Sequence, residues 1–504
     1  MFSSFNIHPF VLVSTFLLLI GILIRSLKAK RRGAYPLPPG PPGELILGHF
    51  RVIPALGPEH KYIEWGMQYD SDILYFNVLG RPIIVINSVK VAHDLLDKRG
   101  ANYASRPRFW GPQFKLHRKI LQQSFTPSAC KSYRGIQQEE ARRACRQILE
   151  DPEDWETLAR RFSSGVVMRI GFGVKIKDKD DPYIQMAVDA DTATGNGGTP
   201  AGTIVDFFPL IRHLPNWLAR SAPLRHARNS KFAIQRLHDE PWAATEPEVK
   251  SGQAKGPSFM RTHYERYFKN VEEGKANEMT LADIKGAAGA ISIAGGNTTW
   301  STIVVCILHL ILYPEVQRKA KAEIDAVTGG DRLPTFGDRE KMPYLEYVIE
   351  ETTRCVPLSP LGVPHASLED DLYEGMLIPK NSIIYANAQA MTHDERIYSN
   401  PDVFNPDRYV PKDQGGLGEP LPEGPFGFGR RVCLGRHLAL AGVYIFMAHL
   451  LATFDLKPIK DSDGNEIPPR FELTVGLSSK PEHFECSIVP RNDKVKGFYK
   501  DQDE

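Results

Sequence analysis

The stretch that decides the fold of this 504-residue chain is Phe426-Gly427-Phe428-Gly429-Arg430-Arg431-Val432-Cys433-Leu434-Gly435. It places one cysteine in a glycine-containing loop, directly before a long apolar segment. A cysteine thiol has a pKa of about 8.5, and only its thiolate binds a metal. Backbone N–H groups of a tight turn, and the start of a helix that follows, favour the thiolate. The loop therefore predicts Cys433 as a thiolate ligand of haem iron.

The neighbours of Cys433 suit the same role. Gly429 and Gly435 are predicted to allow a turn that closes around the sulfur. Arg431 can form a charge-assisted hydrogen bond to an anionic haem propionate, and Phe426 can shield the sulfur from water. A single cysteine in a loop is more often inert and buried. Because five residues, Phe426, Gly429, Arg431, Cys433 and Gly435, all have types that suit this role, we interpret the loop as a haem site.

The loop resembles the haem-binding signature of the cytochrome P-450 family, Phe-x-x-Gly-x-Arg-x-Cys-x-Gly, at every position. The resemblance covers nearly the whole chain after residue 35, because three further motifs follow in the family's order. It implies a mainly α fold with small β-sheets and haem b (iron protoporphyrin IX) as cofactor. It also implies oxidation of a hydrophobic small molecule by O2, with electrons from an NADPH-dependent reductase and cytochrome b5 as a second donor. The segment 364–380 looks most like fungal members that serve secondary metabolism.

The second motif is Glu351-Thr352-Thr353-Arg354. Glutamate and arginine three residues apart lie on one helix face and can pair. An exposed pair of this kind contributes little stability. By resemblance, Arg408 joins Glu351 and Arg354 in a buried charge network behind the haem loop, and a buried network is costly to break. We assign these three residues a structural role.

The third motif, Ala294-Gly295-Gly296-Asn297-Thr298-Thr299, lies in an uncharged run over 286–313. A capping signal at 280–283 and Pro314 bound a predicted helix of about 34 residues, roughly 50 Å long. The length also fits a membrane span, but this Gly-Gly-Asn-Thr-Thr stretch is a poor membrane core. Asn297 also heads a glycosylation pattern, which is implausible inside an apolar helix.

By resemblance, this helix crosses over the haem. Gly295 and Gly296 are expected to loosen it so that oxygen reaches the iron, and Thr298 to hydrogen-bond dioxygen. The family usually has an acidic residue before this threonine. Asn297 can order water but does not titrate near neutral pH, which predicts less efficient oxygen activation. The catalytic candidates are therefore Thr298 and Asn297. The candidate substrate-facing residues are Ala290, Ile291, Ala294, Leu361, Val363 and Val475.

The fourth motif supplies contacts to the haem propionates. Arg118 matches a cationic family position, whereas Phe114 stands where the family usually has tryptophan. His365 matches another position that contacts a propionate. The alternative is a solvated basic helix and an ordinary loop histidine.

The segment between Pro107 and Arg118 is short, with only ten residues from Arg108 to His117. The family usually has a longer stretch here, which forms one wall of the substrate pocket. Either the pocket is open on this side, or residues were lost through a misread exon. An open pocket admits water and favours side reactions. Two alternative functions follow: a haem-binding protein with impaired turnover, or a haem-thiolate isomerase or dehydratase that needs no reductase.

The N-terminal segment predicts a membrane anchor. Residues 7–24 are uncharged and apolar, near the lower length limit for a span, and a basic cluster at 25–32 follows. A cleaved signal peptide would carry its charge before the apolar run. The positive-inside rule keeps the basic cluster and the chain after it in the cytosol. We expect a single-pass protein of the endoplasmic reticulum membrane. Its predicted parts are the anchor with its basic flank (1–32), a Pro-rich hinge (33–44) and the catalytic domain (45–504).

Composition argues against two classes of protein, those that bind nucleic acid and those held together by disulfides. A net charge of +2 argues against nucleic acid as a partner. Six widely spaced cysteines fit a reducing compartment rather than a disulfide framework. Residue patterns predict amphipathic surface helices at 136–150, 314–327 and 339–354, an apolar helix at 436–454, strands at 73–86 and 376–386, and mobile loops at 178–202 and 244–258.

Overall fold

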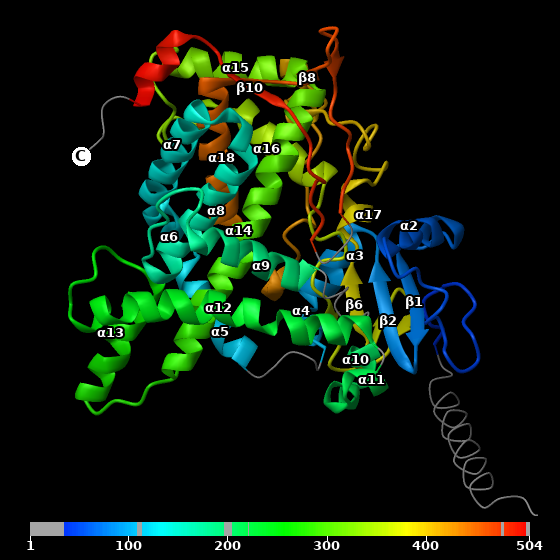
Figure 1. The fold of residues 1–504 in the computed structure, drawn as a ribbon. Coiled ribbons are helices and arrows are strands. Elements are labelled where there is room, and N and C mark those ends of the chain that lie inside the picture. The colour runs from blue at the N-terminus through cyan, green and yellow to red at the C-terminus, as the bar shows by residue number, and fades with distance from the viewer. Residues whose placement is uncertain (1–34, 108–112, 196–203, 220, 475–477, 500–504) are drawn as a thin grey trace, which may run out of the picture.

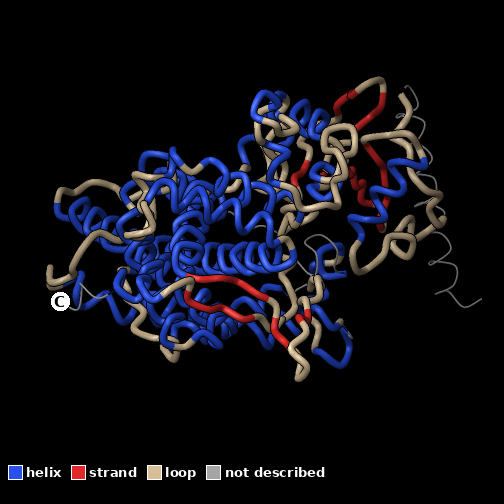
Figure 2. Tube along the Cα trace, turned by 90° about the horizontal axis from the view of Figure 1, so that it is seen from above, coloured by secondary structure: helices blue, strands red, loops and turns tan. Residues whose placement is uncertain are grey.

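The computed structural model describes residues 35–107, 113–195, 204–219, 221–474 and 478–499. As predicted, these residues are mainly helical with small sheets. Figure 1 shows most helices packed together on one side, with the sheet that contains β1, β2 and β6 on the other. Figure 2 shows the strands in separate small groups around the helical mass. The predicted membrane anchor at 1–32 lies outside the described residues.

The helical side is built around α14 (Leu281–Leu312), which α8 (Trp155–Phe172) and α18 (Arg436–Thr453) contact. The predicted cap is present: Thr280 accepts from the backbone of Asp283, whose side chain accepts from the backbone of Thr280. Among the described residues, α14 and α18 are long and apolar enough to span a membrane. Because the larger part of each apolar stretch is buried inside the protein, we assign both as core helices.

The remaining helices surround this core, and all four predicted helical segments are confirmed. Short 3₁₀ turns and one π-helical turn (His93–Lys98) join them. The other α-helices are α2 (Pro58–Gln68), α3 (Val89–Ala92), α4 (Gly100–Tyr103), α5 (Gln113–Ser124), α6 (Pro127–Ser132), α7 (Arg134–Glu150), α9 (Pro182–Gly195), α10 (Ile204–Phe207), α11 (Asn216–Ala219), α12 (Ala222–Lys250), α13 (Phe259–Glu272), α15 (Pro314–Thr328), α16 (Pro343–Cys355) and α17 (Ala388–Thr392).

The main sheet has the strand order β1-β2-β6-β3. Strands β1 and β2 form an antiparallel hairpin, β2 runs parallel to β6, and β3 pairs antiparallel with β6. The predicted strand regions at 73–86 and 376–386 are therefore confirmed, each as two strands. The strands are β1 (Ile73–Val78), β2 (Arg81–Ile86), β3 (His365–Ala366), β4 (Asp371–Tyr373), β5 (Met376–Ile378), β6 (Ile383–Ala386), β7 (Phe454–Lys457), β8 (Ile459–Lys460), β9 (Glu466–Ile467) and β10 (Ser487–Pro490).

One predicted loop is largely helical instead, and the other is helical only over its first part, 244–250. Helix α9 occupies most of the described part of 178–202, and α12 extends through Lys250 into 244–258. Their polar composition predicted loops, but each helix buries an apolar face. The buried residues include Met186, Ala190 and Ala193 in α9, and Trp242 and Val249 in α12. Burial of that face outweighs the weak helix propensity of their Gly, Asp and Pro residues.

The described part of the predicted hinge is attached to the domain rather than free. The backbone carbonyl of Pro36 accepts from Leu377 in β5, and that of Pro39 accepts from Tyr75 in β1. A side chain at Gly40 would collide with the Tyr75 carbonyl, since an added Cβ would lie 2.4 Å from its oxygen. Residues 36–40 therefore belong to the folded domain.

Candidate active site

A cavity of about 300 Å³ lies between α14, α18, α8 and the loop that carries Cys433. Cys433, Phe426 and Thr298 all line it. Its walls are mostly apolar, which excludes water and strengthens polar interactions inside it. The lining includes Ala290, Ile291 and Ala294 from α14, Leu438 and Gly442 from α18, and Phe162 and Val166 from α8.

Cys433 is exposed and lines this cavity. Its backbone N–H donates to the Phe426 carbonyl at 2.8 Å, which closes the turn. Burial raises the pKa of the Cys433 thiol, while the N–H groups of Gly435 and Arg436 and nearby positive charges lower it. Burial prevails, so the protein alone favours the protonated thiol, and a bound metal would be needed to favour the thiolate.

The two predicted loop glycines act differently. Gly429 has a φ of 56°, and an added Cβ would lie 2.1 Å from the Leu96 carbonyl oxygen, so only glycine fits. Gly435 has a φ of −79°, which any residue adopts. The prediction that Gly435 is needed for the turn is therefore wrong. An added Cβ there would meet no atom within 4 Å, and Gly435 lines the cavity, so its missing side chain leaves space beside the sulfur.

Three arginines gather beside the Cys433 loop, and each donates to backbone carbonyls. Arg431 donates to Ala104 at 2.6 Å, Arg118 to Val432 at 2.9 Å, and Arg106 to Pro364 at 2.8 Å and to Val363. The buried His365 ring hydrogen-bonds the Tyr103 carbonyl at 2.9 Å. Within the described residues, no carboxylate pairs with any of the three arginines.

Electrostatics show that this group of cations lacks an anion. Burial and the charges of Arg431 and Arg118 lower the pKa of Arg106 to about 9. Burial and the Arg431 charge also lower the pKa of Arg118, and burial with all three arginine charges lowers that of His365 to about 3. The Nε of Arg106 is buried without a hydrogen-bond partner. A buried cation needs a partner, so this group suits the carboxylates of haem b. Cys433, the space at Gly435 and the three arginines fit that cofactor.

The two catalytic candidates on α14, Thr298 and Asn297, point in different directions. Thr298 lines the cavity, and its hydroxyl donates to the Ala294 carbonyl at 2.7 Å. Asn297 is not among the lining residues. Its side-chain oxygen accepts from Arg160 on α8 at 3.5 Å, and the Arg160 guanidinium lies over the Trp300 ring. Successive helix residues point about 100° apart, so the predicted direct role of Asn297 in the cavity is not supported.

The glycines before Thr298 also act differently from the prediction. Helix α14 runs without interruption through Gly295 and Gly296. An added Cβ at Gly295 would lie 2.7 Å from a methyl carbon of Val167 on α8. The absence of a side chain lets the two helices pack closely, rather than loosening α14.

Glu351, Arg354 and Arg408 meet in one buried network, as the sequence predicted. Glu351 accepts two hydrogen bonds from Arg354, at 2.8 and 2.9 Å, and one from Arg408 at 2.9 Å. It also accepts from Tyr409 and from the backbone of Asn405. Burial opposes ionisation of Glu351, but these hydrogen bonds and charges hold its pKa below the ordinary value. The network fixes the 403–409 segment against α16.

The substrate-facing candidates divide into two groups. Ala290, Ile291 and Ala294 line the cavity. Leu361 does not: it is packed with Tyr62, Trp65 and the apolar residues of β1, β2 and β6 in a separate core. The local sequence gives no sign of this, because the packing partners lie in a sheet that is distant in sequence. Val363 is partly exposed and offers its carbonyl to Arg106, and Val475 lies outside the described residues.

Sequence reasoning missed Arg106 and Arg160. Arg106 follows Ser105 in a loop and precedes Pro107, with no periodic pattern that points to a site. Only the fold brings it near Arg431. The short segment at 108–117 is described only from Gln113 onward, where α5 begins. The expected opening of the pocket on that side stays a prediction.

Comparisons with known proteins agree with this geometry. The sequence pattern of the family described as Cytochrome P450 matches residues 38–486. A cytochrome P450 monooxygenase of Armillaria gallica is 32% identical, over 92% of this chain and 93% of the relative. Cytochrome P450 monooxygenase 98 of Postia placenta is also 32% identical, over 98% and 97%. Cytochrome P450 monooxygenase COX1 of Coprinopsis cinerea is 32% identical, over 96% and 98%.

Proposed function

The chain belongs to the cytochrome P450 family, whose members bind haem and use O2 as monooxygenases, and on that premise we propose that Cys433 holds the haem iron of an oxidoreductase acting on a hydrophobic small molecule. The observation that carries this proposal is the placement of Cys433, Thr298 and a group of anion-seeking arginines around one apolar cavity. We also propose a place in secondary metabolism, and the support is the resemblance of the segment 364–380 to fungal members of that kind.

Each part of the site has a task in this proposal. Haem bound through a thiolate supplies electron donation that favours cleavage of the O–O bond. Arg106, Arg118 and Arg431 hold the haem carboxylates and fix the cofactor's orientation. Ala290, Ile291 and Ala294 form the apolar wall against which a hydrophobic substrate packs. The Thr298 hydroxyl, now bonded to the Ala294 carbonyl, can turn into the cavity and present its proton there.

A basic recess beside the haem loop supports an acidic electron-transfer partner. It has a volume of about 610 Å³ and is lined by the cationic side chains Lys115, Arg118, Lys119, Arg430 and Arg431. Complementary charge speeds the encounter of two proteins and aligns them. We take an NADPH-dependent reductase as that partner, with cytochrome b5 as a second donor. NADPH consumption should slow as salt rises, and a rate independent of ionic strength would count against this recess.

We also propose that residues 1–32 anchor the protein in the endoplasmic reticulum membrane, with the catalytic domain in the cytosol. The support is the apolar run at 7–24 and the basic cluster after it. Deleting 1–32 should release much of the protein from microsomes and leave haem binding intact. Protease protection of the catalytic domain inside the microsomal lumen would contradict this orientation.

The proposed activity is tested by turnover with a reductase, NADPH and a panel of hydrophobic compounds. A product that carries one oxygen atom from labelled O2 is the expected result. A product that forms without O2 and NADPH would instead establish the isomerase or dehydratase alternative. A protein that loads haem but turns over no compound, while a transcript with a longer insert after Pro107 does, would establish the impaired form.

A further inference from the structure

The loop that carries Cys433 rests against the π-helical turn His93–Lys98. An added Cβ at Gly429 would lie 2.1 Å from the Leu96 carbonyl oxygen, so the backbone of the loop approaches the turn closely. Phe428 is buried in the same small core as Leu96. Turns of the π type are rare and often occur at functional sites. The position of this turn therefore helps to determine the position of the Cys433 loop.

His93 joins this turn to the chain segment just before the loop. Its Nδ1 contacts the carboxylate of Asp97 on the same turn, and its Nε2 lies 2.6 Å from a carboxylate oxygen of Glu423. The His93 ring also packs edge-on against Phe428, with ring centroids 5.4 Å apart. Asp97 itself borders the loop, since an added Cβ at Gly429 would lie 2.9 Å from its side-chain oxygen. We call His93, Asp97 and Glu423 the His93 bridge, because they connect the turn to the loop.

The His93 bridge requires the imidazolium form of His93. A neutral imidazole has one N–H group and can donate to one carboxylate only, which leaves its other nitrogen lone pair facing the second carboxylate. Burial opposes the charge on His93, but the hydrogen bonds and charges of Asp97 and Glu423 raise its pKa above the ordinary value. These two carboxylates are the charged groups that act on His93 among the described residues. His93 therefore keeps its proton to a higher pH than an ordinary histidine does.

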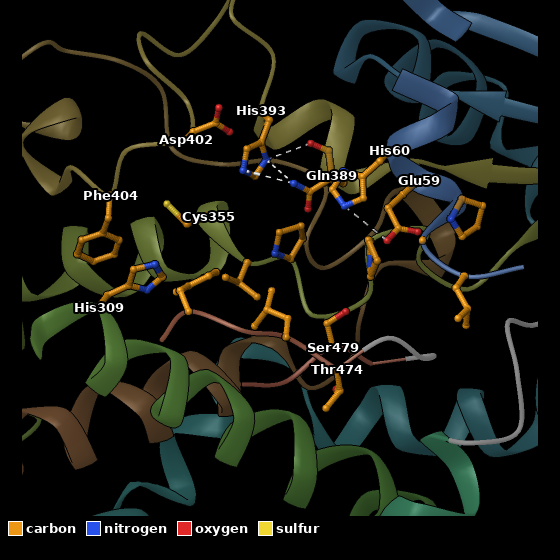
Figure 3. A pocket seen from close by; sticks show the side chains of 18 of the residues that line it. Glu59, His60, His309, Cys355, Gln389, His393, Asp402, Phe404, Thr474 and Ser479 are labelled. Carbon is orange, nitrogen blue, oxygen red and sulfur yellow. Dashed lines mark hydrogen bonds and ion pairs between the residues drawn. The ribbon is translucent and has the colours of Figure 1, made fainter. Parts of the chain in front are cut away.

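In the part of the chain that the structure describes, His93 is the one histidine that pairs with two carboxylates. Figure 3 shows two histidines in other surroundings. His60 faces a single carboxylate, that of Glu59, and His393 hydrogen-bonds the neutral side chain of Gln389. Burial lowers the pKa of His393 to about 4. The contacts of these two histidines are compatible with a neutral imidazole, whereas those of His93 are not.

We propose that His93 is a positioning residue for the haem-binding loop: in its protonated form it holds the loop against the π-helical turn and so keeps Cys433 in place as the thiolate ligand. This inference rests on the proposed function, because it takes Cys433 as the ligand of haem iron. Loss of the proton as pH rises breaks one of the two carboxylate contacts, and the loop can then withdraw more easily. The thiolate-bound state should therefore persist longer at low pH than at high pH.

The test follows the reduced, CO-bound protein in a fixed, mild concentration of urea and measures how fast its thiolate-type band decays. For wild type, the decay rate should rise about two- to fivefold between about pH 6 and about pH 9, the range for partly exposed ion pairs. His93→Gln should decay at the fast rate at every pH, because glutamine offers one donor group and one acceptor, as neutral imidazole does. His93→Arg should decay slowly at every pH, because a guanidinium can donate to both carboxylates and keeps its charge.

The matched control is His483→Gln. His483 also pairs with a carboxylate, that of Glu156 at 2.8 Å, but neither residue lines the Cys433 cavity, so this variant should keep the wild-type pH profile. The positioning role is overturned if His93→Gln and wild type decay at the same rate, or if His93→Arg keeps the wild-type pH dependence. A wild-type protein without a thiolate-type band at any pH would instead overturn the assignment of Cys433 as ligand, and this inference with it.

Discussion

Arg106→Gln should affect the haem-free and haem-loaded proteins in opposite directions. In the haem-free protein, Arg106 donates only to the carbonyls of Val363 and Pro364, and its Nε has no partner. Burial and two neighbouring arginines lower its pKa to about 9. Holding this charge therefore costs stability, since each unit by which a pKa is lowered corresponds to about 1.4 kcal/mol. Glutamine removes the charge and keeps a donor, so the haem-free protein should unfold at the same temperature or a higher one.

The haem-loaded protein should lose affinity for its cofactor. A hydrogen bond to a charged group contributes about 1.5–3 kcal/mol, against about 0.5–1.5 kcal/mol for a neutral one. Replacing the guanidinium of Arg106 should therefore cost about 1–2 kcal/mol of haem binding, a loss of roughly 5- to 30-fold in affinity. The assay is transfer of haem to an excess of haem-free myoglobin, together with thermal unfolding of both forms.

Arg225→Gln is the matched control, because Arg225 is exposed on α12, outside the Cys433 cavity. It should change neither haem transfer nor unfolding. The reasoning fails if Arg106→Gln releases haem at the wild-type rate, or if it destabilises the haem-free protein as much as the loaded one. In the second case Arg106 would be a purely structural residue.

Three further predictions follow from the contacts. Glu351→Gln should lower the free energy of unfolding in urea by about 3–5 kcal/mol, because it leaves buried arginine charges without a partner. The control is Glu346→Gln: Glu346 forms a partly exposed pair with Arg339, and its loss should cost at most about 1 kcal/mol. Equal effects of the two substitutions would contradict the role of the buried network. Burial lowers the pKa of His449 to about 4. As pH is lowered, the unfolded chain binds this proton before the folded protein does, so the free energy of unfolding should decrease between about pH 6.5 and pH 4. His449→Gln should make this decrease less steep, by up to about 1.4 kcal/mol per pH unit. The same pH dependence in wild type and variant would refute this. Thr298→Ala should raise peroxide release per NADPH, whereas Thr302→Ala, on the same helix but outside the cavity lining, should not.

Local patterns predicted the parts of the site that local sequence determines. An uncharged run with a cap at Thr280 predicts α14, and the Phe426–Gly435 loop predicts the turn at Cys433. Glu351 and Arg354 are three residues apart on one helix, so their pairing is also predictable from local sequence. In each case the contact, or the signal for it, lies within a few residues.

The remaining parts depend on packing between distant segments. Arg106 approaches Arg431 only through the fold, and Leu361 is buried by a sheet whose strands lie far away in sequence. The direction of the Asn297 side chain depends on which face of α14 packs against α8. The sequence does not determine that face, because α14 is apolar on every side. Helices α9 and α12 form because their few apolar residues find partners, which composition alone does not reveal.

The central claim is that Cys433 is the thiolate ligand of haem. The most direct measurement is the absorbance of the reduced, CO-bound protein, compared between wild type, Cys433→Ala and Cys306→Ala. Cys306 is buried in α14, outside the Cys433 cavity lining, and serves as the matched control. The account predicts the thiolate-type CO band for wild type and Cys306→Ala, and loss of haem or of that band for Cys433→Ala. An unchanged band in Cys433→Ala would contradict the account.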